Sequence, residues 1–352
     1  MRPTAPPDYP DDPIAEPLQR GRGALSNESS RFDSERRIRT TDGWDAPPTD
    51  ATGEDELPPL RTTLTRDATR TILARNSSPD VPFDRSINPY RGCEHGCIYC
   101  FARPTHAYLG LSPGLDFETR LLFKPDAAKL LTEELVSPKY RPDVVAMGTN
   151  TDPYQPVERE LKITRQILRV LSDFNNPVGI VTKNALVARD TDILGDMARR
   201  NLAEVFLSIT TLDRALARDM EPRASTPQRR LDAIRALADA GVPVGVMTAP
   251  MIPGLNDHEM EAILEAAQKA GATRAGFIVL RLPLEIKELF EEWLRQHRPD
   301  RAERVLSLIR QIRGGALNSA QFGQRMRGEG PIAQLLSARF AAATKRLGLN
   351  LV

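Results

Sequence analysis

Short apolar segments alternate with longer segments of helical periodicity between about residues 85 and 280. The apolar segments are rich in β-branched residues, and each has the length of one strand: 85–88, 143–147, 178–182, 204–209, 244–249 and 276–280. Between them, apolar residues recur every three or four positions, as in Leu231, Ile234 and Leu237. Most successive segments lie roughly 30–40 residues apart, which is the length of a right-handed βαβ unit.

This alternation predicts an α/β fold of about six βα units around a parallel sheet. Both faces of such a sheet are covered, which explains why its strands are apolar throughout. The pattern alone is compatible with an open doubly wound sheet or with a barrel. No GxGxxG follows the first strand and no GxxxxGK[ST] occurs, so neither phosphate-binding fingerprint supports a nucleotide fold. Thr226-Pro227 predicts a helix start, and Gly241 and Gly271 predict helix ends.

The two ends of the chain differ from the middle. Residues 1–60 contain ten Pro and seven Arg against thirteen Asp and Glu, a composition that predicts a disordered tail without packed contacts. Residues 61–84 are expected as a lead-in to a core at 85–280. Residues 281–352 are expected to be helical, with eleven Lys or Arg against three acidic residues from Trp293 onward.

Composition excludes several classes of protein. The 352 residues carry 48 Lys and Arg against 47 Asp and Glu, so the chain is not a polyelectrolyte as a whole. No segment approaches about 18 apolar residues, and the first residues lack the apolar core of a secretory signal. Three cysteines exclude a disulfide scaffold. We therefore expect a cytoplasmic protein with no membrane partner.

All three cysteines fall within eight residues, at Cys93, Cys97 and Cys100. Buried structural cysteines would be scattered over several elements. Zinc would need a fourth ligand such as His95 or His106, and His95 lies cramped between the first two cysteines. An iron–sulfur cluster takes thiolates from one short loop. Three thiolates leave one iron of a four-iron cluster open to a substrate or cofactor.

The CxxxCxxC spacing, with Tyr99 before the last cysteine and a strand directly before the loop, resembles the signature of the radical S-adenosylmethionine superfamily. The resemblance implies a partial (β/α)6 TIM-like barrel and a 4Fe-4S cluster held by Cys93, Cys97 and Cys100. It further implies reductive cleavage of S-adenosylmethionine to a 5′-deoxyadenosyl radical that abstracts hydrogen from a substrate. A reductant such as flavodoxin or ferredoxin is then an expected partner.

Other segments resemble spore photoproduct lyase and its largely uncharacterised relatives. The resemblance implies that eight residues contact S-adenosylmethionine: Tyr99, Gly148, Lys183, Ser208, Glu221, Arg223, Ile252 and Gly254. Lys183 and Ser208 would hold the methionine carboxylate, which suits an ammonium and a hydroxyl at strand ends. Gly148 matches part of the Gly-Gly-Glu that receives the methionine amino group.

The remaining assignments concern later segments. Glu221 and Arg223 would line the cofactor or substrate side, and Ile252 and Gly254 would pack the adenine. One position departs from the lyase, which carries a hydrogen-donor cysteine where this chain has Thr149. Because the chain has no fourth cysteine, thymine-dimer repair by that mechanism is not expected.

Two other functions stay open at this point. One is a zinc-stabilised nucleic-acid-binding protein that uses the Arg-rich C-terminal region as its phosphate-binding surface. The other is an electron carrier with a closed cluster, against which the lack of a fourth thiol argues. The Arg-rich region also admits a nucleic-acid or other anionic substrate for a radical enzyme, with Arg325 and Arg327 expected in a loop.

Overall fold

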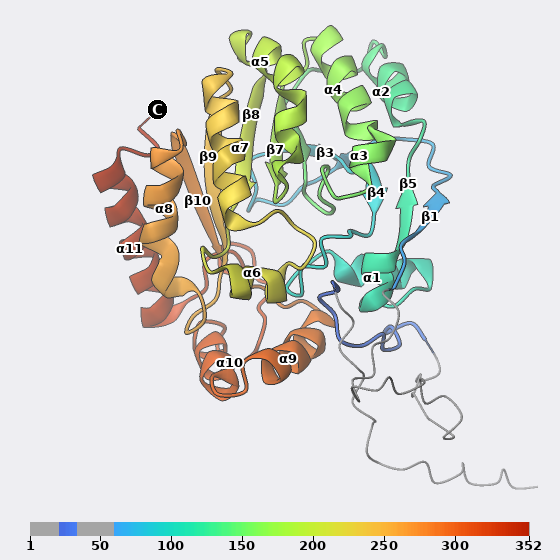
Figure 1. Cartoon of the computed structure of the whole chain (residues 1–352). Coiled ribbons are helices and arrows are strands. Elements are labelled where there is room, and N and C mark those ends of the chain that lie inside the picture. Colours follow the sequence, from blue (N-terminus) through green and yellow to red (C-terminus); the bar gives the residue numbers. More distant parts are fainter. Residues whose placement is uncertain (1–20, 34–59, 352) are drawn as a thin grey trace, which may run out of the picture.

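In the computed structural model, residues 21–33 and 60–351 are described, and they form a curved sheet with helices on its outer side (Figure 1). The main sheet has seven strands in the order β10-β9-β8-β7-β6-β3-β2. They are β2 (Leu73–Arg75), β3 (Arg85–Ile87), β6 (Val145–Met147), β7 (Val178–Thr182), β8 (Ala203–Ser208), β9 (Val244–Met251) and β10 (Arg274–Val279).

Strand pairing gives the sheet its barrel-like form. Every neighbouring pair from β3 to β10 is parallel, and β2 pairs antiparallel with β3 at one edge. The two edge strands, β10 and β2, are not paired with each other in the described sheet, so the barrel is incomplete. All six strands expected from the apolar segments are present, and the prediction of an α/β fold with a partial (β/α)6 barrel is confirmed.

Amphipathic helices cover the outer face of this sheet. They are α2 (Ala127–Leu135), α4 (Ile163–Asp173), α5 (Thr191–Arg199), α7 (Pro227–Asp239) and α8 (Met260–Lys269). Their apolar faces and the strands share one core, in which Ile167, Ile180 and Val246 are fully buried. Thr226 caps α7 by accepting a hydrogen bond from the Arg229 N–H, as the Thr-Pro pair predicted.

Shorter elements connect the βα units and extend the sheet. The short helices are η1 (Arg103–Leu109), α1 (Leu115–Thr119), α3 (Glu158–Leu161), η2 (Ala185–Asp190), α6 (Arg214–Met220) and η3 (Asp257–Glu259). A second sheet of three strands joins β1 (Thr63–Arg66), β5 (Arg120–Phe123) and β4 (Tyr90–Arg91) in the order β1-β5-β4. Residues 61–84, expected as a lead-in, thus supply one strand to each sheet.

The C-terminal region is helical, as predicted. It contains α9 (Ile286–His297), α10 (Ala302–Gln311) and α11 (Gly330–Leu347). Helix α11 lies beside α8, whereas α9 and α10 lie next to α6 (Figure 1) and share a second core with the cysteine loop. No helix in the described residues has the length and apolarity needed to span a membrane.

The cations of this region differ in their surroundings. Five of the eleven lie in ion pairs with acidic side chains: Arg295, Arg298, Arg301, Arg325 and Arg339. Arg313 is buried and donates to the backbone carbonyls of Val279, Leu280 and Gln324. Arg325 lies in a loop, as expected, but its guanidinium is paired with Asp80.

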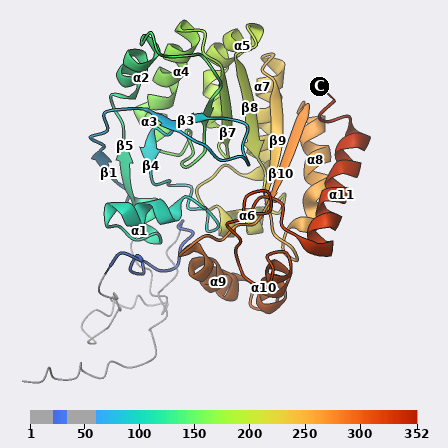
Figure 2. The ribbon, with the colours of Figure 1, turned by 180° about the vertical axis from the view of Figure 1, so that it is seen from behind.

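Residues 21–33 correct one prediction. They lie against α1 and α9 (Figure 2), and the N–H groups of Gly23 and Ala24 donate to the Glu118 carboxylate at 2.9 and 2.8 Å. Ser26 donates to Glu292 of α9 at 2.8 Å. The expectation of no packed contact is therefore wrong for this segment, because backbone N–H groups bind one buried carboxylate and the side chains of Ala24 and Leu25 are buried. Residues 1–20 and 34–59 lie outside the described residues.

Candidate functional site

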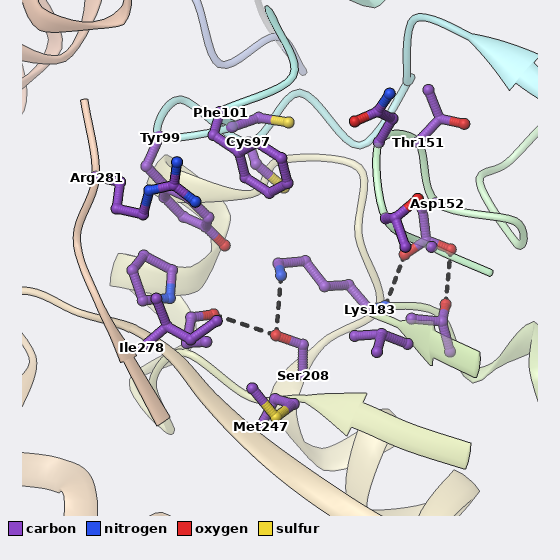
Figure 3. Close-up of a pocket in the computed structure, with 18 of the residues that line it drawn as sticks. Cys97, Tyr99, Phe101, Thr151, Asp152, Lys183, Ser208, Met247, Ile278 and Arg281 are labelled. Carbon is purple, nitrogen blue, oxygen red and sulfur yellow. Dashed lines mark hydrogen bonds between the residues drawn. The ribbon is translucent and has the colours of Figure 1, made fainter. Parts of the chain in front are cut away.

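A cavity of about 290 Å³ lies at the carboxyl ends of strands β6 to β10, where parallel barrels build their sites. One side is the loop that holds the three cysteines. The other side consists of residues that end or follow the strands, among them Gly148. Lys183, Ser208 and Arg281 belong to this side as well (Figure 3). The barrel thus brings together side chains that are almost 190 residues apart in the chain.

The three thiols face this cavity and none is in a disulfide. Cys93 and Cys97 are buried, and Cys100 is partly buried. Burial, with the nearby carboxylate of Asp152, raises the pKa of Cys93 well above its ordinary value, and burial also raises the pKa of Cys97 and Cys100. Such thiols become thiolates when a positively charged group binds them, so the donor set fits a metal cluster.

A buried ion pair lies next to the cysteine loop and stabilises it. Arg103 pairs with Glu118, and both side chains are fully buried. The Arg103 Nε also donates to the Cys97 carbonyl at 2.9 Å. Gly96 has a φ of 66°, and a Cβ there would lie 2.7 Å from a Glu118 oxygen. The loop therefore takes its shape from contacts with a helix that follows it in the chain.

Both histidines considered as zinc ligands have other partners. His95 is buried with Nδ1 3.4 Å from Asp152 Oδ2 and Nε2 3.1 Å from Asn184 Nδ2. His106 contacts the Arg120 carbonyl through Nε2 at 3.0 Å. In residues 21–33 and 60–351, no three His, Cys, Asp or Glu side chains are arranged to hold a single metal ion. The geometry therefore gives no support to a Cys3His zinc site.

Asp152 joins the loop after β6 to the end of β7. Its carboxylate accepts hydrogen bonds from the Thr182 hydroxyl and from the Lys183 N–H, both at 2.7 Å. Burial alone would raise the pKa of Asp152, but His95 and these hydrogen bonds lower it to about 2. Gly148 has a φ of 88°, and a Cβ there would lie 1.9 Å from the Val181 carbonyl oxygen, so only glycine fits this turn.

Lys183 and Ser208 form a polar pair inside the cavity. Lys183 Nζ donates to Ser208 Oγ at 2.9 Å, and Ser208 donates to the Ala249 carbonyl at 3.1 Å (Figure 3). The ammonium lies 5.6 Å from the centre of the Tyr99 ring. None of the ion pairs in the described structure includes Lys183. An ammonium and a hydroxyl are thus placed to receive one anionic group.

Glu221 lies behind the cavity rather than in its lining. Its carboxylate pairs with Arg230 and accepts hydrogen bonds from the hydroxyls of Tyr99 and Thr210. Burial opposes its charge, yet Arg230 and Lys183 lower the pKa of Glu221 to about 2. Glu221 therefore holds the hydroxyl of Tyr99 and does not line the cavity, and its contact with a cofactor stays a prediction.

Three further residues from the sequence-based assignment also lie away from the cavity. Arg223 is 3.2 Å from Glu94 and hydrogen-bonds the loop through its N–H, which donates to the His95 carbonyl. Ile252 is fully buried in the core formed with α9 and α10. A Cβ at Gly254 would meet Leu308 of α10. The strand end contributes Met247, Ala249 and Pro250 to the cavity instead.

Comparison with known proteins identifies the family. The model of the radical SAM superfamily matches residues 87–267, which is half of the chain. The chain belongs to the radical SAM superfamily. Uncharacterised proteins of Mycobacterium tuberculosis and Mycobacterium bovis are 38% identical to this radical SAM enzyme over 232 residues, 65% of this chain and 68% of theirs. An uncharacterised protein of Methanocaldococcus jannaschii is 30% identical over 173 residues, 49% of this chain and 62% of its own.

Solved structures of spore photoproduct lyase share the fold. One matches with a TM-score of 0.59 and 18% identity over 81% of this chain and 80% of the lyase. A complex of the lyase with a dinucleoside spore photoproduct matches with a TM-score of 0.58 and 17% identity over the same shares. At this identity the likeness concerns the fold of the radical SAM enzyme and not its substrate.

The sequence-based assignment missed several residues of the cavity, among them Arg281 and Phe101. Arg281 follows β10, and Phe101 follows the last cysteine; both contribute to the lining. The signal for Arg281 was its place at the carboxyl end of a predicted strand, where barrel enzymes position functional side chains. No comparable sequence signal marks Phe101.

Proposed function

We propose that this radical SAM enzyme holds a 4Fe-4S cluster on Cys93, Cys97 and Cys100 and binds S-adenosylmethionine in the adjoining cavity. The observation that carries the proposal is that three thiols from one loop and the Lys183–Ser208 pair line the same cavity. When bound and reduced, the cluster supplies the electron that cleaves S-adenosylmethionine to methionine and a 5′-deoxyadenosyl radical, which removes hydrogen from a substrate.

The residues of the chain would each have a defined task. Lys183 and Ser208 would bind the methionine carboxylate, because a charge-assisted hydrogen bond is stronger than a neutral one. Asp152 fixes the backbone of Lys183 and so directs its ammonium into the cavity. Tyr99 is held by Glu221 and presents its ring beside that ammonium. The turn at Gly148 would let the backbone approach the cofactor closely.

Thr149 bears on the reaction. It lines the cavity at the position where the lyase-like motif carries a cysteine, and its hydroxyl lies 3.3 Å from Asn88 Oδ1. A hydroxyl O–H bond is much stronger than a thiol S–H bond, so Thr149 does not replace a cysteine as hydrogen-atom donor. We therefore propose a reaction other than the one that depends on this cysteine, with an external one-electron reductant such as flavodoxin or ferredoxin.

The experiment is purification without oxygen, followed by measurement of iron, sulfide and S-adenosylmethionine affinity. The proposal requires iron and sulfide in the protein and a change in the spectrum of the reduced cluster when S-adenosylmethionine is added. Lys183→Ala should weaken S-adenosylmethionine binding about tenfold or more with iron content unchanged. Lys269→Ala, on the exposed face of α8, is the matched control. Protein that binds zinc and lacks sulfide would contradict the proposal.

A further inference from the structure

Arg281 enters the cavity from the end of strand β10, and its backbone is fixed. The Val279 N–H donates to the Met326 carbonyl at 2.9 Å, and the Leu280 N–H donates to the Met251 carbonyl at 3.0 Å. The side chain of Arg281 then lines the cavity, near Tyr99 and Phe101 (Figure 3). Its position is therefore set by the fold and not by a flexible loop.

The guanidinium of Arg281 lacks a strong acceptor. Its Nε is buried without a hydrogen-bond partner, and one Nη contacts only the Met326 sulfur, at 3.5 Å. No acidic side chain of the described residues lies within ion-pair distance of it. Burial, and then the charge of Arg325, lower the pKa of Arg281. A partly buried cation of this kind is costly without a partner, and a bound anion supplies one.

The neighbouring arginine shows the contrast. Arg325 pairs with Asp80 and donates to the Ser78 hydroxyl. Of these two arginines, Arg281 is therefore the one that can bind an anionic ligand. The two guanidinium groups are close enough for the charge of Arg325 to lower the pKa of Arg281. A guanidinium offers parallel N–H donors that match a phosphate or a carboxylate.

The surroundings of Arg281 are apolar. Its guanidinium carbon lies 5.5 Å from the centre of the Phe101 ring, which is 46% exposed. Phe83, Ile278 and Met326 continue this lining. A ligand that fits here carries an anionic group next to an apolar or planar body, because aromatic faces favour such contacts.

S-adenosylmethionine does not account for this cation. The cofactor has one carboxylate, which the proposed function assigns to Lys183 and Ser208. Those residues end β7 and β8, whereas Arg281 follows β10, and β9 separates β8 from β10 in the sheet. The cavity thus has two cationic positions for one cofactor anion.

We propose that Arg281 binds a phosphate or carboxylate of the substrate, whose apolar part lies against Phe101. The proposal rests on the proposed function, since it places the substrate beside the cofactor site. It defines the substrate class as an anion with an apolar or planar body.

The test is binding of small probes to the anaerobically purified, unreduced protein with S-adenosylmethionine present, by titration calorimetry. Phenyl phosphate represents the phosphate, phenylacetate the carboxylate, and 2-phenylethanol the uncharged body. Wild-type protein should bind at least one of the two anions more tightly than the alcohol. Arg281→Gln should weaken that binding about tenfold or more. Arg281→Lys should weaken it less, because lysine keeps the positive charge although it lacks the parallel N–H donors. S-adenosylmethionine affinity should not change.

Two controls separate the possible failures. Arg274→Gln removes the same charge from the other end of β10, where Arg274 pairs with Glu204, and should leave probe binding intact. Phe101→Ser should weaken phenyl phosphate binding but not the binding of inorganic phosphate. Equal probe affinity in wild type and Arg281→Gln, or no binding of either anion to wild type, would overturn the proposal. A loss of S-adenosylmethionine affinity in Arg281→Gln would instead assign Arg281 to the cofactor, while missing iron and sulfide in wild type would refute the proposed function itself.

Discussion

The two sides of the cavity are built in different ways. The side formed by strands β6 to β10 comes from repeated βα units, in which strands β6 to β9 are largely buried and helices pack outside them. The cysteine loop, residues 93–100, contains no helix or strand. Arg103 donates to the Cys97 carbonyl of the loop and pairs with Glu118, whose carboxylate also accepts hydrogen bonds from the N–H groups of residues 23 and 24. Ile98 and Tyr99 of the loop pack in the core shared with α9 and α10.

Because of this difference, the two sides should differ in how well they tolerate single substitutions. On the strand side, apolar packing is shared among many residues, so one polar change removes a small part of the support. On the loop side, a single carboxylate, Glu118, accepts hydrogen bonds from two N–H groups and from Arg103. We therefore expect the loop side to fail from single substitutions that the strand side tolerates.

The largest expected effect is on metal content. Replacing Cys93, Cys97 or Cys100 by Ala removes a thiolate that no other cysteine of the chain can supply. Iron content, measured after anaerobic purification, should fall sharply in each variant. The helix content of the βα units should be unchanged. If two of the three variants kept full iron and full cleavage of S-adenosylmethionine, the ligand assignment would be wrong.

The next effect tests the support of the loop. Glu118→Ala leaves Arg103 buried without its partner, and loss of one member of a buried pair costs about 3–5 kcal/mol. The melting temperature should fall by roughly 10 °C. Glu265→Ala is the control on the strand side, because Glu265 forms an exposed pair with Lys269 on α8. Similar melting temperatures for the two variants would show that the sides do not differ as described.

A smaller effect concerns the N-terminal segment. Removal of residues 1–33 deletes the contacts to Glu118 and α9, whereas removal of residues 1–20 leaves those contacts in place. The longer truncation should melt several degrees below the shorter one, since two hydrogen bonds to the buried Glu118 carboxylate and one to Glu292 are lost. Equal melting temperatures would mean that these contacts add nothing to stability.

The smallest effect is a pH dependence at Glu221, which links helix α7 to Tyr99 of the cysteine loop. The pKa of Glu221 is lowered to about 2 from an ordinary value of 4.5. A carboxylate with a lowered folded-state pKa stabilises the fold above its ordinary pKa, and this contribution disappears as the pH falls from about 4.5 to 2. Denaturant titrations at several pH values in this window should give a shallower decline for Glu221→Gln than for wild type. A decline of equal slope would show that Glu221 does not carry its charge in the folded protein.

The sequence by itself determined the repeating part of the molecule. Apolar strands of five or six residues and helices of regular periodicity are local features, so residues 178–182 and 204–209 could be placed within one or two positions of β7 and β8. The spacing of the cysteines likewise indicated the radical SAM superfamily, to which the chain belongs. Lys183 and Ser208 were placed at strand ends, and the parallel sheet brings such ends to one edge.

Only the tertiary structure determined the contacts between residues that are far apart in the sequence. Glu118 and the segment 21–24 meet although 94 or more residues separate them, and no local pattern encodes that contact. The resemblance placed Glu221 on the cofactor or substrate side, but the partner that binds its carboxylate, Arg230, is identified only by the fold. Arg281 differs from the paired Arg325 solely in its neighbours. Hydrophobic periodicity is a property of adjacent residues, whereas the pairing of buried charges depends on which elements the completed fold brings into contact.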